Sequence, residues 1–457
     1  NMIHEECGVF GIYDRDGYDV ARMTYAGLFA MQHRGQESCG IAVNRDRDIY
    51  LYKNVGHVNE VFHDRELDEL KGQFAIGHVR YATSGGTGVL NAQPLVTWYV
   101  KGQLAMAHNG NISNAKELKK ELQQSGAIFQ TTTDTELMMH LVARERLKVG
   151  RVELALVEMM KRVEGSYSVV MMSPQKLMAC RDPQGIRPLC IGKIGDNTYV
   201  VASESCALDT IRAEFIRDVE PGEVIVIDKD GLRSIKDNCK GQSRTCIFEY
   251  VYFARSDSII DGQSVHEARK NMGKILAQTD PVDADMVIGV PDSGIDAAIG
   301  YALESGIPYG KGLVINRYIG RTFIQPTQSE RKQAVRLKIN ALKQTVAGKR
   351  IIMVDDSIVR GTTSAKLVDM LREAGATEVH MRISSPPFVW PCYFGTDIPD
   401  KDQLLACKYS VDEICKMIGA DSLVFFPLER LAETIPDAKC GFCDGCFTGN
   451  YPYQIKS

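Results

Sequence analysis

The chain has 457 residues, of which 44% are hydrophobic and 25% charged, the composition of a globular protein with room for two or three domains. Its 54 Lys and Arg residues nearly balance its 58 Asp and Glu residues, and the formal net charge of −4 favours neither nucleic acid nor a membrane as a partner. No apolar run approaches the roughly 18 residues of a membrane span, and the N-terminus lacks the features of a secretory signal, so we expect a cytoplasmic protein.

The first part of the chain, up to about residue 235, has the pattern of short strands separated by glycine-rich turns. The predicted strands are residues 8–13, 74–79, 104–108, 168–172, 199–202 and 223–227. Helical spacing of apolar residues predicts two helices, at 25–31 and 134–147. Strands grouped with a few helices favour a layered α+β domain, which we place at residues 7–235.

A polar stretch at residues 234–244 marks the predicted domain boundary. After it, the apolar runs 286–290 and 351–354 alternate with the helical segments 295–304 and 364–374, and Gly375 is the predicted C-cap of the last of these. Alternation of strand and helix is typical of a parallel sheet, so residues 245–457 should form an α/β domain.

Thirteen cysteines is a high count, but disulfide frameworks belong to small secreted domains, and this chain is long and shows no signal. We expect most of the cysteines to be small buried apolar residues. This group comprises Cys39, Cys180, Cys190, Cys206, Cys239, Cys407 and Cys415.

The most specific segment is residues 351–363, where an apolar strand ends in Asp355 and Asp356 and a loop rich in hydroxyl groups precedes a helix. Open α/β sheets bind ligands at the carboxyl ends of their strands, where two adjacent carboxylates suit ribose hydroxyls or hydrated Mg²⁺. Backbone N–H groups ahead of a helix suit a phosphate dianion. The alternative, an acid pair that only caps a helix, is disfavoured because strand, acids and loop occur together.

This segment resembles the signature by which type I phosphoribosyltransferases bind 5-phosphoribosyl-1-pyrophosphate (PRPP). The resemblance implies that Asp355 and Asp356 lie at the ribose and at Mg²⁺, and that the following loop holds the 5-phosphate. A second loop, 291–294, resembles the pyrophosphate loop of that family, and its Ser293 would contribute to the Mg²⁺ environment. The residues assigned to PRPP are Asp355, Asp356, Ser357, Val359, Arg360, Gly361, Thr362 and Thr363.

A basic segment at residues 317–338 contains a single acid, Glu330. Its cations are Arg317, Arg321, Arg331, Lys332, Arg336 and Lys338. A cationic flap would stabilise the charge that accumulates on a pyrophosphate leaving group. A solvated basic helix face is the alternative.

A second set of motifs lies in the first half. Cys7 begins a strand, and a lone cysteine is usually structural. Arg80 ends another strand, while Asn109 and Gly110 offer a side-chain amide and a glycine N–H, the pair that an oxyanion hole needs. Asp134 places a carboxylate at the start of a helix.

Together these motifs resemble class II glutamine amidotransferases of the N-terminal-nucleophile superfamily, whose fold is an αββα sandwich. The resemblance implies that Cys7 is the nucleophile and that Asn109 and Gly110 form the oxyanion hole. The α-amino group of an N-terminal cysteine, with a pKa of about 7.7–8.0, can be the base for its thiol. Residues 1–6 would therefore be a propeptide, removed on maturation, or an expression remnant. The residues implied to bind glutamine are Arg80, Thr83, His108 and Asp134.

Near the C-terminus, Cys440, Cys443 and Cys446 form two overlapping C-x-x-C pairs, a spacing found in zinc and iron–sulfur sites. Further ligands would have to come from elsewhere, and Cys246 and Cys392 are the candidates.

The order of domains and motifs resembles, over essentially the whole chain, the iron–sulfur branch of the glutamine-dependent PRPP amidotransferases. The resemblance implies a [4Fe–4S] cluster on Cys246, Cys392, Cys443 and Cys446, with Cys440 as a competitor of Cys443. It further implies a homotetramer that is inhibited by purine nucleotides. The implied reaction converts glutamine and PRPP to 5-phosphoribosylamine, glutamate and pyrophosphate, the first committed step of purine synthesis.

Two other classes of protein share part of the pattern. Glucosamine-6-phosphate synthase and asparagine synthetase are glutamine-dependent but lack the acid pair Asp355 and Asp356 and its phosphate loop. A ligand-sensing regulator with a phosphoribosyl-binding fold would not need to retain these acids. The acid pair therefore favours an enzyme.

Overall fold

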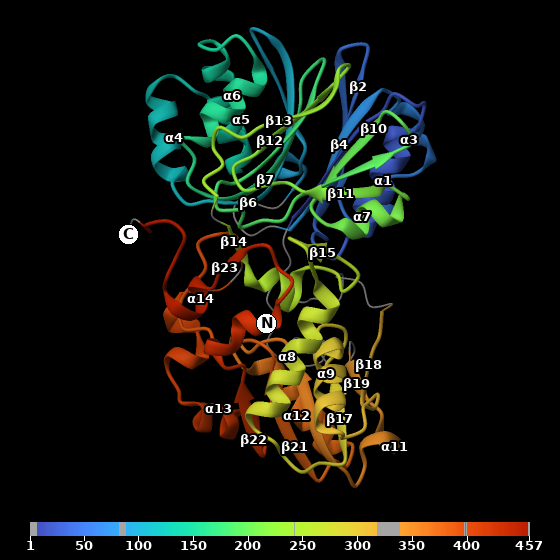
Figure 1. Ribbon diagram of the computed structural model, residues 1–457, viewed down its shortest axis with the longest axis vertical. Coiled ribbons are helices and arrows are strands. Elements are labelled where there is room, and N and C mark those ends of the chain that lie inside the picture. Colours follow the sequence, from blue (N-terminus) through green and yellow to red (C-terminus); the bar gives the residue numbers. More distant parts are fainter. Residues whose placement is uncertain are drawn as a thin grey trace.

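The computed structural model describes residues 7–81, 88–241, 243–317, 339–396, 398 and 400–455. Figure 1 shows two halves, one above the other, formed by the first and second parts of the chain. The polar stretch at 234–244 joins β13 (Gly231–Ile235), the last strand of the first half, to β14 (Arg244–Cys246), the first strand of the second.

Two antiparallel sheets form the first half. One consists, in spatial order, of β11 (Glu214–Asp218), β9 (Cys190–Ile194), β10 (Thr198–Ala202), β1 (Gly8–Tyr13), β4 (Phe74–Arg80), β2 (Ser38–Arg45) and β3 (Asp48–Val55). The other consists of β13, β12 (Val224–Asp228), β8 (Leu177–Arg181), β7 (Gly165–Met172), β6 (Gly102–Ile112) and β5 (Leu95–Tyr99).

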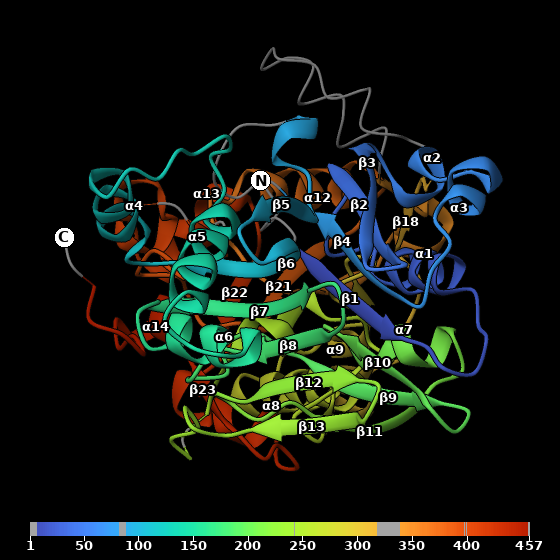
Figure 2. The same cartoon turned by 90° about the horizontal axis from the view of Figure 1, so that it is seen from above.

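The two sheets pack face to face, and Val9, Ile76, Ala107 and Val170 meet in the core between them. The outer face of the first sheet is covered by α1 (Val20–Ala30), α2 (Val58–Val61), α3 (Asp64–Glu69) and α7 (Ser205–Thr210). The outer face of the second is covered by α4 (Ala115–Gln124), α5 (Asp134–Arg146) and α6 (Val152–Met160). Figure 2 shows these layers from above. The αββα expectation is confirmed.

The prediction of only two helices in this half was wrong. In α4 only Leu118 and Leu122 are buried, so its apolar stripe is too narrow to stand out in the sequence. In α6 most residues are buried, so it lacks the polar face that reveals a helical period. The helix predicted at 25–31 begins earlier, at Val20, because Asp19 caps it by accepting a hydrogen bond from the Arg22 N–H.

The second half is built on a parallel sheet, as predicted, in the order β17 (Met286–Gly289), β20 (Arg350–Asp355), β21 (Glu378–Ile383) and β22 (Ser422–Phe425). One face packs against α8 (Val265–Thr279) and α9 (Ile295–Ser305), and the other against α12 (Thr362–Glu373) and α13 (Val411–Ile418). A two-stranded ribbon of β18 (Leu313–Ile315) and β19 (Ile339–Ala341) lies beside them.

The end of the chain returns to the boundary between the halves. β23 (Gly441–Cys443) pairs in parallel with β14, which places Cys443 opposite Cys246. The short helix α14 (Gly445–Thr448) follows, and the backbone oxygen of Cys446 accepts from the N–H groups of Val389 and Trp390. The C-terminal segment is therefore tied to the beginning of the second half.

Buried polar contacts join the halves. Arg181 donates to both carboxylate oxygens of Asp261 at 2.8 Å, and the Thr245 hydroxyl donates to the same group at 2.6 Å. Elsewhere the Ser166 hydroxyl donates to the backbone oxygen of Phe394 at 2.7 Å. Among the described residues, no helix combines the length and the apolar character needed to cross a membrane.

Candidate active sites

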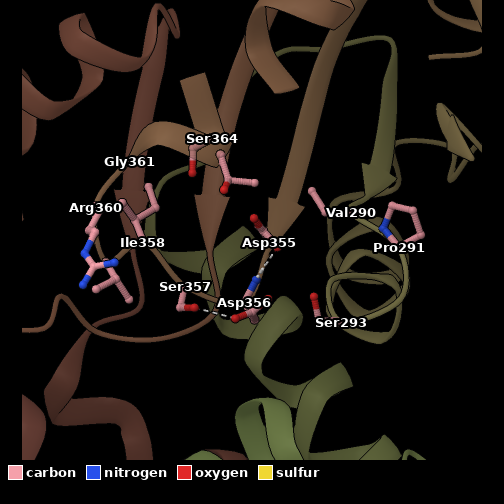
Figure 3. Close-up of a pocket in the computed structure, with 12 residues that line it drawn as sticks. Val290, Pro291, Ser293, Asp355, Asp356, Ser357, Ile358, Arg360, Gly361 and Ser364 are labelled. Carbon is pink, nitrogen blue, oxygen red and sulfur yellow. Dashed lines mark hydrogen bonds between the residues drawn. The ribbon is translucent and has the colours of Figure 1, made fainter. Parts of the chain in front are cut away.

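A pocket opens between the loops that follow β17 and β20 (Figure 3). These neighbouring strands run in parallel, so the loops at their carboxyl ends adjoin. The pocket is lined by Val290, Pro291, Ser293, Asp355, Asp356, Ser357, Ile358, Val359, Arg360, Gly361, Thr363 and Ser364. Of the residues predicted to bind PRPP, only Thr362 is absent from this lining; it is exposed at the start of α12.

Two carboxylates lie at the centre of the pocket. Asp355 and Asp356 are each 7% exposed, and burial, together with the negative charge of Asp356, raises the pKa of Asp355 well above its usual range. The Asp356 N–H donates to Asp355 Oδ1 at 3.0 Å, and the Ser357 hydroxyl donates to Asp356. Two like charges held together out of water favour a cation or donor hydroxyls as a ligand.

Gly361 shapes the loop ahead of α12. It is the N-cap of that helix and has φ +72°, a left-handed conformation that glycine adopts without steric cost. A Cβ there would lie 2.8 Å from Leu405 Cδ2. Thr363 and Ser364, in the first turn of α12, line the pocket beside it. This loop suits a phosphate because it presents hydroxyls and backbone N–H groups together.

The loop after β17 contains a cis peptide bond between Pro291 and Asp292. The Asp292 carboxylate accepts from Arg317 Nη2 at 3.1 Å. Arg317 belongs to the described residues, whereas the remainder of the predicted basic segment lies outside them. The prediction for the remaining cations therefore stays a prediction: Arg321, Arg331, Lys332, Arg336 and Lys338.

The glutamine site predicted in the first half begins at Cys7, which immediately precedes β1. Pairing of Gly8 with Val79 puts Arg80, at the end of β4, at the same edge of the sheet as Cys7. The Cys7 thiol lies 3.6 Å from the backbone oxygen of Tyr81. Arg80 is 3% exposed and donates to Glu37 at 3.1 Å. Thr83 lies outside the described residues.

His78 links this edge to the second sheet. It pairs with Val9 in β1, and its Nε2 lies 3.0 Å from the backbone oxygen of His108 in β6. Burial lowers the pKa of His78 to about 3, so the ring is neutral and Nε2 carries the proton that it donates. Gln93 Oε1 accepts from the His108 N–H at 2.8 Å. The backbone just before Asn109 is thus held from two directions.

Asn109 and Gly110, the predicted oxyanion donors, are adjacent residues of β6. Asn109 is 1% exposed, and within the described residues neither atom of its side-chain amide has a hydrogen-bond partner. Gly110 has φ +134°, and a Cβ there would lie 2.1 Å from the Ser166 oxygen. Because buried amides are nearly always hydrogen-bonded, an orphaned one in a polar site indicates a place for a substrate oxygen.

Asp134 lies beside this pair. Its carboxylate accepts from the Ile112 N–H at 3.1 Å and is 3.3 Å from His108 Nδ1. Burial alone would raise the pKa of Asp134, but His108 and the hydrogen bonds outweigh it, so that the pKa is lowered. An ionised carboxylate at this position suits an ammonium group.

Arg34 was given no role by the sequence analysis. It is 1% exposed, and its Nε donates to the backbone oxygen of Cys7 at 3.1 Å. Its terminal nitrogens donate to Glu204 and Glu249, which are 170 and 215 residues away in the chain. No local pattern marks partners so distant.

Four cysteines gather where β14 and β23 pair. Burial and then the thiols of Cys392, Cys246 and Cys443 raise the pKa of Cys446 well above its usual range. Cys440 instead lies 3.8 Å from the Tyr250 hydroxyl. Among the described residues, no three His, Cys, Asp or Glu side chains are arranged as a site for a single metal ion.

The expectation that the other cysteines are buried was wrong for Cys407, which is exposed, and too strong for Cys239 and Cys415, which are partly exposed. Cys407 ends the short helix η5 (Leu405–Cys407) at the surface, where its thiol donates to the Val389 oxygen.

Comparisons with known proteins cover nearly the whole chain. A model described as a glutamine amidotransferase domain matches residues 78–210, and one described as a phosphoribosyl transferase domain matches 256–384. The chain is 49% identical to an amidophosphoribosyltransferase of Bacillus subtilis, over 99% of this chain and 95% of that protein. It is also 49% identical to one of Archaeoglobus fulgidus, over 98% of each.

The fold is shared with a solved structure of the Bacillus subtilis glutamine PRPP amidotransferase complexed with ADP and GMP. The TM-score is 0.91 at 48% identity, and 98% of each chain is covered. The similarity therefore includes both halves and their relative arrangement.

Proposed function

The chain belongs to the amidophosphoribosyltransferase family, and on that premise we propose which of its residues carry the reaction. The enzyme converts glutamine, PRPP and water to 5-phosphoribosylamine, glutamate and pyrophosphate, in purine biosynthesis.

In the glutamine half, Cys7 attacks the side-chain amide carbon, while Asn109 and Gly110 donate to the oxygen that becomes negative. Ammonia then leaves, and water hydrolyses the thioester. The observation that carries this proposal is the buried Asn109 amide, without a partner among the described residues, on a strand braced against that of the nucleophile. The α-amino group of Cys7 becomes the base once residues 1–6 are removed.

The remaining predicted residues hold glutamine by its amino-acid end. Arg80 pairs with the α-carboxylate and Asp134, whose lowered pKa keeps it ionised, pairs with the α-ammonium. Thr83 and His108 complete the binding site. Opposite charges at the two ends orient the side-chain amide toward Cys7.

In the transferase half, Asp355 and Asp356 engage the ribose and Mg²⁺, and Ser293 adds a hydroxyl to the metal environment. The buried acid pair would hold a hard divalent cation, which would supply positive charge near the departing pyrophosphate. The loop 357–363 holds the 5-phosphate. Ammonia must reach this site without meeting bulk water, because protonation would remove its nucleophilic lone pair.

Cys246, Cys392, Cys443 and Cys446 fit a [4Fe–4S] cluster. All four donors are thiols, and Cys246 and Cys443 are paired residues of adjacent strands. Thiolates are the usual ligands of such clusters, and these four would hold it. When bound it would supply a structural cross-link, since the reaction transfers no electrons.

We also propose that this enzyme is a cytoplasmic homotetramer and is inhibited by purine nucleotides. The ADP and GMP named in the related Bacillus subtilis structure support the proposal on nucleotides.

The experiment that tests the proposed nucleophile compares two nitrogen sources. Cys7→Ala should abolish product formation from glutamine but keep formation from ammonium salts, because the transferase pocket lies in the other half. Cys39→Ala is the matched control, since burial raises the pKa of Cys39 to about 12 and leaves it unreactive. Equal loss of both activities in folded Cys7→Ala protein would reject the assignment.

A further inference from the structure

Arg34 is a fully buried cation that contacts the backbone of Cys7, the proposed nucleophile. Its Nε donates to the backbone oxygen of Cys7, so the direction of the guanidinium affects where Cys7 lies. A buried guanidinium is held in place by its hydrogen-bond acceptors, because an unpaired charge in the interior is costly. The carboxylates around Arg34 therefore matter to Cys7.

Those carboxylates come from different halves of the molecule. Glu204 lies before α7 in the glutamine half, and its Oε1 accepts from Arg34 Nη1 at 2.5 Å. Glu249 begins η2 (Glu249–Phe253) in the transferase half, and its two oxygens accept from Arg34 Nη2 at 2.7 Å and Nη1 at 2.9 Å. The contact with Glu249 is bidentate, which fixes the plane of the guanidinium.

Glu204 also accepts hydrogen bonds from donors other than Arg34. His33 lies 2.7 Å from its Oε1, while the Ser258 hydroxyl and the Arg255 N–H donate to its Oε2 at 2.6 and 2.9 Å. Glu249, by contrast, has Arg34 as its two-point partner and Arg187 at 3.4 Å. Of these two carboxylates, Glu249 is the one that orients Arg34.

We propose that Glu249 of the transferase half is a positioning residue for glutamine cleavage, acting on Cys7 through Arg34. The inference rests on Cys7 being the nucleophile, as proposed above. It means that the glutamine site is completed by the domain that consumes its ammonia, and that a separated glutamine half would hold its nucleophile less well.

The segment that carries Glu249 is also held from the PRPP side. Arg269 in α8 donates from Nε to the Tyr250 oxygen at 2.9 Å and from Nη2 to the Ala254 oxygen at 2.7 Å, bracketing η2. Arg269 is buried, and Asp356 of the PRPP pocket is among the acids that act on it. One short segment therefore lies between the acid pair and Arg34.

Glu249→Gln tests the proposal in the full-length enzyme, with intact mass confirming that chains begin at Cys7. The amide keeps the shape of the side chain but removes the charge and one acceptor. We expect the glutamine-dependent rate to fall by on the order of tenfold. The rate at which iodoacetamide alkylates Cys7 should change as well. The ammonium-dependent rate should stay unchanged, because the PRPP pocket is intact.

The matched control is Asp261→Asn, which breaks the other buried bidentate pair between the halves, with Arg181. This variant should lose stability without changing the ratio of glutamine to ammonium activity. Glu249→Asp keeps the charge but shortens the side chain, so its ratio of glutamine to ammonium activity should lie between those of wild type and Glu249→Gln. If Glu249→Gln does not fold, Glu249→Asp provides the test.

An equal loss with both nitrogen sources, or wild-type use of glutamine by both Glu249 variants, would overturn the proposal. Failure of the underlying assignment looks different: Cys7→Ala would then still use glutamine, whatever the Glu249 variants do.

Discussion

His78 shows how one buried side chain can join two layers of a sandwich. It leaves β4 of the first sheet and donates to the backbone of β6 in the second, next to Asn109. Its other ring nitrogen has no hydrogen-bond partner in the described part of the chain, so the ring has one contact to make and stays neutral. The strand that follows Cys7, the proposed nucleophile, and the strand that carries Asn109, the proposed oxyanion donor, are thereby held together.

This neutrality predicts a pH dependence of stability. In the folded protein the pKa of His78 is about 3, below the ordinary value of about 6.5. Below pH ~6.5, His78 is therefore protonated in the unfolded chain but stays neutral in the folded chain. Stability is therefore fully present above that pH and is lost as the pH falls toward 3, by at most about 1.4 kcal/mol per pH unit.

His78→Gln should remove this contribution, since the glutamine amide can donate to His108 but does not titrate. The difference in thermal midpoint between wild type and variant, measured at several pH values from 7 to 4 as set out by the pKa argument, should shift in favour of the variant as the pH falls. A difference that does not vary with pH would contradict the assigned neutral state.

The acid pair predicts opposite effects on activity and stability. Replacing both Asp355 and Asp356 with Asn keeps their size but removes two buried like charges. Turnover at saturating Mg²⁺ should fall on the order of a hundredfold with either nitrogen source, while the thermal midpoint of the metal-free protein should rise. Turnover equal to wild type would show that the pair takes no part in the reaction.

At the scale of elements, the sequence predicted strands better than helices. The runs at 8–13 and 351–354 are apolar and bounded by turn residues, and they match β1 and most of β20. The helix α4 was missed because only Leu118 and Leu122 mark its apolar face, and α6 was missed because it is buried on most sides.

The same distinction explains the sites. That the residues proposed to bind PRPP line one pocket was predictable, because most of the lining is one segment, 355–364, whose chemistry is local. Arg34, His78 and Glu249 were not assigned because their roles depend on partners in other sheets or in the other half. The sequence alone does not distinguish a buried, neutral histidine from a solvent-exposed one.

The loop ahead of α12 gives a prediction of its own. Gly361→Ala would strain a left-handed backbone, by about 1–2 kcal/mol, and press a Cβ against Leu405. The KM for PRPP should rise by on the order of tenfold, which is the equivalent of about 1.4 kcal/mol of lost binding. The rate with saturating PRPP should change less.

Gly375→Ala is the control at the other end of the same helix. Gly375 also has positive φ, at +97°, but a Cβ there would meet Ala347, away from the pocket. This variant should lower the thermal midpoint and leave the KM for PRPP unchanged. Equal effects of the two substitutions on KM would mean that the loop conformation is not what holds the phosphate.

At the scale of the whole molecule, the proposed cluster would fasten the C-terminal segment to the start of the second half through Cys246 and to the loop after β21 through Cys392. Cross-linking distant parts of a chain restricts the unfolded state, and metal binding adds free energy to the folded one. Cys443→Ser should therefore lose iron and lower the thermal midpoint, whereas Cys440→Ser, whose thiol faces Tyr250 instead, should keep iron.

Iron and acid-labile sulfide per chain, measured on anaerobically purified protein, check this prediction. Wild-type protein should be brown. Colourless, folded wild-type protein with one tightly bound zinc ion would show that the site binds zinc instead of a cluster. Loss of iron in Cys440→Ser but not in Cys443→Ser would show that Cys440, not Cys443, is the ligand.

The pairing of β14 with β23 has a consequence for synthesis on the ribosome. β14 emerges as soon as the second half begins, but its partner β23 is made only after all four strands of the parallel sheet. Domains fold as they emerge, so the first half is complete while β14 still presents an unpaired edge, which is a template for pairing with other chains. The nascent protein thus passes through a long interval of exposure that ends only when β23 has been made. Translation that stalls before residue 441 would leave that edge open.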